Sequence, residues 1–206
     1  MRVLIQGAGA LGSLLGYHLA EAGHEVTLGL RCRPDAWPRQ DGSPALSLFS
    51  PNSKNKKTVP IRLTWPERRD TPADLLLLTT KAQDAEEAAR RAEPLLLPEG
   101  AAVLLSNGLG LERAVSARLS GRLFLRGLAY CGALLESPGG VRDTGAGRIV
   151  FGLWENEGQA ASDAGGRLES ILRTFREAGI AAEAAPRLDL ALWEKAMANL
   201  AINPLG

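Results

Sequence analysis

The glycine-rich hexapeptide GAGALG, at residues 7–12, most constrains how this chain can fold. It follows an apolar run, residues 3–5, that is typical of a buried strand, and it opens a helix-favouring stretch over residues 10–22. In a strand–turn–helix unit of this kind the first glycine permits a tight turn, the second leaves the backbone open to a pyrophosphate, and the third lets helix and strand pack closely. The order predicts a nucleotide-binding unit, with the anion at the helix N-terminus. A purely structural glycine turn is the alternative, since 23 of the 206 residues are glycine.

Composition indicates an ordinary globular protein. The formal net charge is +1 and 45% of the residues are hydrophobic, so no global field would recruit nucleic acid or a membrane surface. No apolar run approaches the ~20 residues that cross a bilayer, and no secretory leader opens the chain. Cys32 and Cys131 lack the spacing of a metal or redox motif. We expect a cytoplasmic protein without a metal site, a nucleic-acid partner or a membrane partner.

Strand-like runs recur along the chain and alternate with helix-favouring segments. The runs cover residues 25–30, 74–79, 101–105 and 123–129, and the helix-favouring segments cover 82–93, 111–119 and 166–178. This alternation predicts an α/β, Rossmann-like, doubly wound fold with a mainly parallel sheet. Residues 34–66 predict extra short strands, and residues 130–136 and 147–153 predict an antiparallel pair that extends the structure.

Polar side chains follow several of these strands, and ligands bind parallel α/β sheets at the carboxyl ends of the strands. The second strand runs into Arg31, where an NAD site would place an acidic residue, so a 2′-phosphate and hence NADP is favoured. Lys81 follows the 74–79 run, and Asn107 follows the 101–105 run. The alternatives are a solvated arginine at position 31 and a turn residue before glycine at position 107.

The C-terminal segment, residues 186–204, carries a polar row on a predicted helix. Lys195, Asn199 and Asn203 are spaced at i, i+4 and i+8, so they lie on one helix face. A solvated face would more usually carry Lys, Glu or Arg than two asparagines, which are mediocre helix formers. The row therefore indicates a site, and a chance pattern on a solvated face is the alternative.

Six motifs along the chain together carry a family resemblance. They are GAGALG at 7–12, Arg31, TKAQ at 80–83, SNGLG at 106–110, RDTGAGRIVFG at 142–152 and LWEKAMANLAINPL at 192–205. In this order they resemble the ketopantoate reductase (2-dehydropantoate 2-reductase) family. The first motif is generic, whereas the Lys-x3-Asn-x3-Asn-Pro ending is specific. The resemblance implies reduction of the C2 ketone of 2-dehydropantoate by NADPH, which gives pantoate on the route to pantothenate and coenzyme A.

The resemblance also implies a role for each matched residue. The cofactor NADP(H) would contact Gly7, Ala8, Gly9, Ala10, Leu11, Gly12, Arg31, Lys81, Gln83, Asn107 and Ala133. A small 2-oxoacid substrate would contact Asn107, Asn199 and Asn203, and Lys195 would be the proton donor. The chemistry agrees, because an ammonium stabilises and then protonates an oxygen on which hydride transfer builds charge. Lys81 is a candidate for the neighbouring cation that lowers the pKa of Lys195.

The family has a second, all-helical domain that closes the cleft. We expect residues 1–185 to form the NADP-binding Rossmann-like domain, and residues 186–206 to form the first helix of that helical domain, most of which is missing. Because water would then reach the site, we expect tight NADPH binding with weak or absent turnover. The apolar face of this last helix, which includes Trp193, predicts self-association.

Two rival interpretations stay open. One is an NADP(H)-binding or redox-sensing module without turnover. The other is a reductase of another small 2-oxoacid, or an opine-like dehydrogenase. Addition of ketopantoate to the cofactor-loaded protein separates the enzyme from the binding module, because only the enzyme oxidises NADPH.

Overall fold

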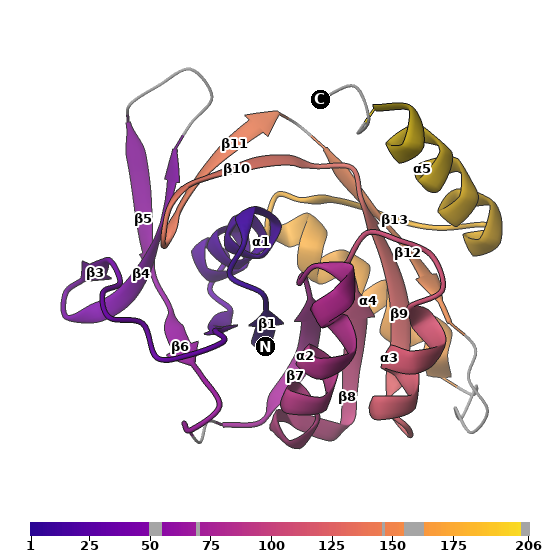
Figure 1. The fold of residues 1–206 in the computed structure, drawn as a ribbon, viewed down its shortest axis with the longest axis horizontal. Coiled ribbons are helices and arrows are strands. Elements are labelled where there is room, and N and C mark those ends of the chain that lie inside the picture. The colour runs from indigo at the N-terminus through magenta and orange to yellow at the C-terminus, as the bar shows by residue number, and fades with distance from the viewer. Residues whose placement is uncertain (50–54, 69–70, 146, 155–162, 203–206) are drawn as a thin grey trace.

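Two β-sheets organise this protein in the computed structural model, which describes residues 1–49, 55–68, 71–145, 147–154 and 163–202 (Figure 1). The larger sheet contains β1 (Arg2–Gln6), β2 (Glu25–Gly29), β6 (Arg62–Thr64), β7 (Ala73–Leu78), β8 (Leu96–Leu104), β9 (Leu123–Ala129), β12 (Arg148–Leu153) and β13 (Ala181–Ala184). Their order is β13-β12-β9-β8-β7-β1-β2-β6. All neighbours pair in parallel except β9 and β12. The prediction of a mainly parallel sheet with an antiparallel extension is confirmed.

A smaller sheet is built from the segments between the main strands. It contains β3 (Arg39–Gln40), β4 (Ser43–Phe49), β5 (Lys56–Pro60), β10 (Gly132–Ser137) and β11 (Gly140–Gly145). Its order is β10-β11-β4-β3, and β5 also pairs with β4. The strands β4 and β5 confirm the extra strands predicted in residues 34–66, while β6 joins the larger sheet beside β2.

The predicted antiparallel pairing of residues 130–136 with residues 147–153 is wrong. β10 pairs instead with β11 through a turn at Gly139, whose φ is +71°, and β12 pairs with β9. The short turn brings β10 and β11 together directly, because a glycine there accepts a left-handed backbone. Ile149 and Phe151 of β12 are both 0% exposed, so this strand belongs in the covered larger sheet.

The helix α1 (Ala10–Glu21) lies between the two sheets (Figure 1). Its side chains are buried nearly all round, because it has a sheet on both sides. Gly16 lies close to both sheets. A Cβ there would lie 3.1 Å from Leu46 Cδ1 in the smaller sheet and 3.4 Å from Ile5 Cδ1 in the larger sheet. This packing holds the N-terminus of α1 at the carboxyl end of β1.

The other helices cover both faces of the larger sheet. They are α2 (Ala85–Ala92), α3 (Glu112–Arg118), α4 (Ala164–Glu177) and the short 3₁₀ helices η1 (Ala82–Asp84) and η2 (Glu93–Leu95). α2 and α3 pack with Leu76 and Phe124 on one face. α4 lies on the α1 face, where Phe175 meets Phe151 edge-on with ring centres 5.0 Å apart. Helices on both faces confirm the doubly wound arrangement.

The last helix, α5 (Leu188–Ile202), lies against β9 and β12 at the edge of the molecule (Figure 1). Leu192 is 8% exposed, and a Cβ at Gly152 would lie 2.7 Å from Leu188 Cδ1, so the helix rests directly on β12. The outer face of α5 exposes Leu190, Trp193, Met197 and Leu200.

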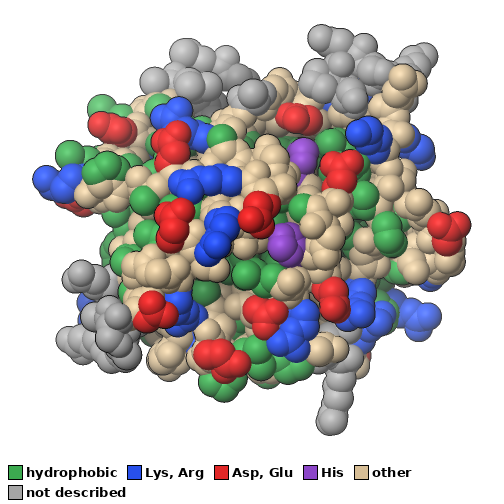
Figure 2. Space-filling view, turned by 180° about the vertical axis from the view of Figure 1, so that it is seen from behind, with side chains coloured by type: hydrophobic (Ala, Val, Ile, Leu, Met, Phe, Trp, Pro, Cys, Tyr) green, Lys and Arg blue, Asp and Glu red, His purple; other side chains and the backbone are tan. Residues whose placement is uncertain are grey.

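The surface seen from behind carries basic and acidic side chains interspersed with apolar ones (Figure 2). Across the described residues, arginines pair with nearby carboxylates, as Arg62 does with Glu25 at 3.1 Å. Such exposed pairs contribute little stability individually. Within the described part of the chain, none of the helices has the length and apolar character needed to cross a membrane.

Candidate functional site

The glycine turn after β1 is held by its neighbours. Gly7 has a φ of +114°, and Thr79 Oγ1 at the end of β7 donates a hydrogen bond to Gly7 O at 2.8 Å. A Cβ at Gly12 would lie 2.0 Å from Gly7 O, so the first turn of α1 packs directly on this backbone. A Cβ at Gly9, by contrast, would meet no heavy atom of the described residues within 4 Å. The turn is therefore closed toward the protein and open at Gly9, as an approaching phosphate requires.

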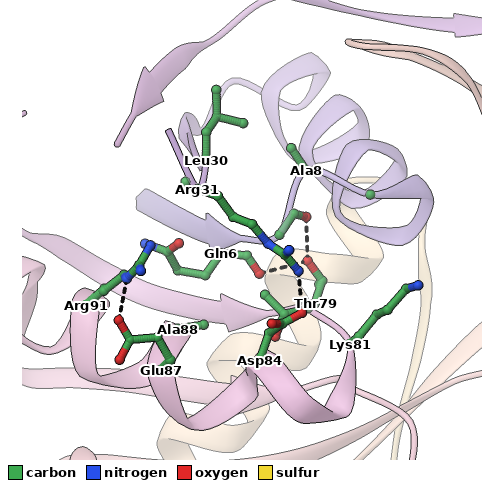
Figure 3. Close-up of a pocket in the computed structure, with 14 residues that line it drawn as sticks. Gln6, Ala8, Leu30, Arg31, Thr79, Lys81, Asp84, Glu87, Ala88 and Arg91 are labelled. Carbon is green, nitrogen blue, oxygen red and sulfur yellow. Dashed lines mark hydrogen bonds and ion pairs between the residues drawn. The ribbon is translucent and has the colours of Figure 1, made fainter. Parts of the chain in front are cut away.

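A cavity of about 580 Å³ opens beside this turn (Figure 3). It lies at the carboxyl ends of β1, β2 and β7, which is where parallel sheets bind ligands. Its volume falls within the range of small-molecule sites, about 300–1,000 Å³. Of the residues predicted to contact the cofactor, it brings together Gly7, Ala8, Gly9, Arg31 and Lys81. We call this space the first cavity.

Arg31 and Asp84 meet at the first cavity. Arg31 Nη2 donates to Asp84 Oδ2, and both side chains line the space (Figure 3). The Arg31 side chain is 76% exposed, so the pair contributes little to stability. The Arg31 guanidinium therefore already lies at the cavity. A phosphate that bound to it there would also approach the Asp84 carboxylate.

A second cavity, of about 380 Å³, adjoins the first and shares Gln6, Leu30 and Arg91 with it. Its lining includes Trp65 and Arg68, and the Arg68 guanidinium lies 5.2 Å from the centre of the Trp65 ring. Aromatic and guanidinium planes both provide stacking surfaces. The two cavities together offer room for a flat base as well as for phosphates.

A third cavity, of about 450 Å³, lies between α5 and the turn that follows β8. Asn107, Lys195 and Asn199 all line it, so segments far apart in the sequence converge there. Asn203, the remaining residue predicted to contact substrate, lies outside the described residues. The prediction that Lys195 and Asn199 share a helix face is consistent with their common position on this wall.

The third cavity lies next to the segment that borders the first. A Cβ at Gly108 would lie 3.9 Å from Ala82 Cβ, and Ala82 follows directly on Lys81 of the first cavity. The two spaces therefore occupy the same edge of the sheet.

The Lys195 side chain points into the protein. Its Nζ donates to Ala129 O at 2.6 Å and lies 5.1 Å from the centre of the Tyr130 ring. Burial, followed by the positive charge of Arg126, lowers the pKa of Lys195 to about 8. A pKa near the working pH suits a group that donates a proton. The neighbouring cation is thus Arg126 rather than the expected Lys81.

Arg126 is a site residue that the motifs did not reveal. It is 2% exposed in the middle of β9, and its Nε lies 2.9 Å from Glu112 Oε1. The sequence did contain a signal for this residue. The apolar run 123–129 predicts a buried strand, and an arginine inside such a strand requires a charged or hydrogen-bonding partner. The tertiary structure identifies Glu112, on α3, as that partner.

Some predicted cofactor residues lie outside the lining of these three cavities. Residues 10–12 form the first turn of α1, just beyond the glycine turn. Gln83 lies in η1, where the next residue, Asp84, lines the first cavity. Ala133 lies in β10 and is half-buried. Contacts of these residues with a cofactor stay predictions.

Comparisons with known proteins agree with this arrangement. The family model described as ketopantoate reductase PanE/ApbA matches residues 3–156. The 2-dehydropantoate 2-reductase of Pyrococcus horikoshii is 32% identical over 209 residues, and that of Vibrio cholerae is 32% identical over 207 residues. Among solved structures, the 2-dehydropantoate 2-reductase from Geobacter metallireducens GS-15 has a TM-score of 0.82 at 30% identity.

The two relatives and the solved structure each align with 100% of this chain but with a smaller share of their own length. The chain spans 63% of the Pyrococcus protein, 62% of the Vibrio protein and 64% of the Geobacter chain. The family match includes the glycine turn, the Lys81 segment and the Asn107 turn. The chain belongs to the ketopantoate reductase PanE/ApbA family.

Proposed function

We propose that this chain provides the cofactor-binding and proton-donating part of an NADPH-dependent 2-dehydropantoate 2-reductase, which forms pantoate on the route to pantothenate and coenzyme A. The observation that carries the proposal is the convergence of Lys195, Asn107 and Asn199 on one cavity beside the first cavity. The shared name of the Pyrococcus and Vibrio relatives supports ketopantoate as the substrate.

The glycine turn fits the pyrophosphate of a dinucleotide. Gly9 is the N-cap residue of α1 and makes no side-chain cap, so N–H groups of the first helical turn are available to an anion. Arg31 at the first cavity would hold a 2′-phosphate through charge-assisted hydrogen bonds, which favours NADP(H) over NAD(H). When bound, the reduced nicotinamide supplies a hydride, and Lys81 and Asn107 would border it.

The residues of this chain would then handle charge and orientation. The Lys195 ammonium would donate a hydrogen bond to the ketone oxygen, stabilise the charge that develops there and transfer its proton. Release of the proton is easier because burial lowers the pKa of Lys195 to about 8. Asn107 and Asn199 would orient the carboxylate and hydroxyl groups without competing for the proton, since a carboxamide does not titrate in this range.

An NADPH oxidation assay tests this function. The chain is loaded with NADPH, 2-dehydropantoate is added, and the loss of NADPH absorbance is followed. We expect slow oxidation that depends on substrate, because Asn107 is exposed and water reaches the site. Lys195→Met should abolish it, and Lys56→Met, at an exposed lysine of β5, should not.

The outcomes of this assay separate the candidate functions. Cofactor binding without any oxidation would favour an NADP(H)-binding module, the second candidate, which the open backbone at Gly9 supports equally well. Failure to bind NADPH would contradict both. Faster oxidation with another small 2-oxoacid than with ketopantoate would identify a reductase of that acid. The side chains of Lys195, Asn107 and Asn199 would bind carboxylate and carbonyl groups in general.

Three further expectations remain part of this proposal. The division of the chain at residues 185 and 186, with α5 as the start of a helical domain, accords with the greater length of the relatives. Self-association of a second copy through the outer face of α5 accords with its exposed apolar side chains. A cytoplasmic location accords with the free thiols of Cys32 and Cys131.

A further inference from the structure

Arg126 is a buried cation whose hydrogen bonds reach the turn that carries Asn107. Its Nη2 donates to Ser106 O at 2.7 Å and to Gly108 O at 3.0 Å, so a single nitrogen holds the carbonyls on both sides of Asn107. Its Nη1 donates to Leu104 O at 2.6 Å, at the end of β8. The guanidinium therefore connects the end of a strand to the turn that follows it.

Arg126 also lines the third cavity, as Lys195 does. Arg126 is 2% exposed, and its Nε donates to Glu112 Oε1 at 2.9 Å. A guanidinium bound at all three nitrogens inside the protein keeps one orientation, because its planar fork fixes the directions of its donors. Its charge and its hydrogen bonds are thus fixed features of the site.

We propose that Arg126 is a positioning residue of this site, which holds the turn at residues 106–108 so that Asn107 faces the third cavity and which keeps a fixed positive charge beside the Lys195 ammonium. The catalytic meaning of this role rests on the proposed reductase function. The two physical effects, on the turn and on the lysine, exist whether or not the chain turns over a substrate.

The conformation of the turn explains why it depends on an outside anchor. Gly108 has a φ of +115° and Gly110 a φ of +81°, so the backbone adopts left-handed conformations at two nearby positions. Glycine reaches these conformations at little steric cost but also leaves them readily. Two charge-assisted hydrogen bonds from Arg126 select one conformation and with it the direction of Asn107.

The charge on Arg126 acts on Lys195 together with groups from the strands that α5 packs against. Arg126 on β9 and Cys131 just after β9 act through their charges, and Tyr130 presents its ring to the ammonium. Arg148, at the start of β12, lies 5.3 Å from the centre of the same ring. A like charge in a poorly solvated wall favours the neutral form of lysine, so Arg126 promotes release of the proton.

The test removes the buried ion pair and measures the turn and the lysine separately. Arg126→Met/Glu112→Gln takes out both charges, so no lone carboxylate is left in the core. The backbone NMR order parameters of residues 106–110 should fall from the rigid range of about 0.85 to below about 0.6, because the turn carbonyls lose the charged donor that holds them. The pH dependence of Lys195 acylation, read by mass spectrometry, should show its pKa rising by about half a unit or more, while burial keeps it below the ordinary value.

A second arginine, which directly precedes β9, provides the matched control. Arg122 pairs with Glu93 at 2.9 Å, and its Nη2 donates to Leu96 O at 3.2 Å, at the far end of β8 from the Asn107 turn. Arg122→Met/Glu93→Gln should therefore leave both measurements at their wild-type values. It loses the same kinds of contact as the Arg126 double variant, so it corrects for general loss of stability.

Arg126→Lys separates the effect on the turn from the effect on the pKa of Lys195. It also tests the proposal if the double variant does not fold. A lysine keeps the charge but lacks the planar fork that spans the two carbonyls. The order parameters of the turn should fall while the pKa of Lys195 stays lowered. Unchanged order parameters of residues 106–110 in a folded Arg126 variant would overturn the proposal, and so would equal changes in the Arg122 control. Neither measurement uses a cofactor, so a chain that binds or oxidises no NADPH contradicts the proposed function alone.

Discussion

Lys195 Nζ lies 2.6 Å from the main-chain oxygen of Ala129, so a helix near the C-terminus is tied to the end of a central strand. Lys195 also lines the cavity that Asn107 lines. The acceptor is a neutral carbonyl, which offsets the burial of a positive charge less than a carboxylate would. The lowered pKa of Lys195 follows from this arrangement together with the nearby charge of Arg126.

The pKa of Lys195 predicts how a reductase activity depends on pH. The lysine has to be protonated to serve as the donor, and its pKa is lowered to about 8. We therefore expect substrate-dependent NADPH oxidation to fall about tenfold for each pH unit above that value. Steady-state rates measured with saturating NADPH across this range test the expectation. A rate that stays level up to about pH 10 would exclude Lys195 as the proton donor.

The same pKa predicts a change in stability. The pKa of Lys195 is lowered from 10.5 to about 8 by folding, so between these values the unfolded chain binds more protons than the folded chain. The free energy of unfolding should consequently rise with pH over this window, and below it the unfavourable burial of the charge is present in full. Urea unfolding at about pH 7 and about pH 10 measures the rise, and Lys195→Met should reduce it. Equal pH dependence in both proteins would contradict the assignment.

Two glycines of the same turn should respond to alanine in different ways. A Cβ at Gly12 would lie 2.0 Å from Gly7 O, so Gly12→Ala should lower the free energy of unfolding by about 1–3 kcal/mol. A Cβ at Gly9 would meet no described heavy atom within 4 Å, so Gly9→Ala should fold normally and lose NADPH affinity. Denaturant unfolding and cofactor titration distinguish the two. Wild-type affinity in Gly9→Ala would show that the pyrophosphate does not lie there.

Arg31 and Asp84 should set the preference between the two nicotinamide cofactors. Arg31→Ala should weaken NADPH binding about tenfold and leave NADH binding nearly unchanged, because only NADPH carries the 2′-phosphate. Asp84→Asn removes the carboxylate that now pairs with Arg31, so NADPH should bind more tightly. Fluorescence titrations with both cofactors measure these changes. An equal loss of NADH affinity in Arg31→Ala would place the 2′-phosphate elsewhere.

The outer face of α5 should mediate self-association. Trp193 is 63% exposed and Leu200 69% exposed, so a second copy would remove considerable apolar surface from water. Trp193→Glu should shift the protein toward monomer, as measured by light scattering over a range of concentrations. Glu194→Gln, at the next exposed position of the helix, serves as the control and should leave the association state unchanged. A wild-type chain that is monomeric throughout would contradict this prediction.

Short-range features of the sequence were enough to predict most of the larger sheet. The runs at residues 74–79 and 101–105 became parts of β7 and β8, because leucine and valine in unbroken runs suit a strand that is covered on both faces. Strand pairing in the smaller sheet was harder to predict. β11 pairs in parallel with β4, which lies far away in the sequence, and no local pattern specifies that partner.

Local patterns in the sequence were enough to predict the glycine turn, most strands of the larger sheet and the shared helix face of Lys195 and Asn199, because steric freedom and periodicity act between near neighbours. Folding in three dimensions, by contrast, brought charges together that no local pattern connects. It paired Arg126 with Glu112 and set Arg126, rather than Lys81, beside Lys195. Electrostatic effects depend on distance and burial in space, and separation along a chain specifies neither of them.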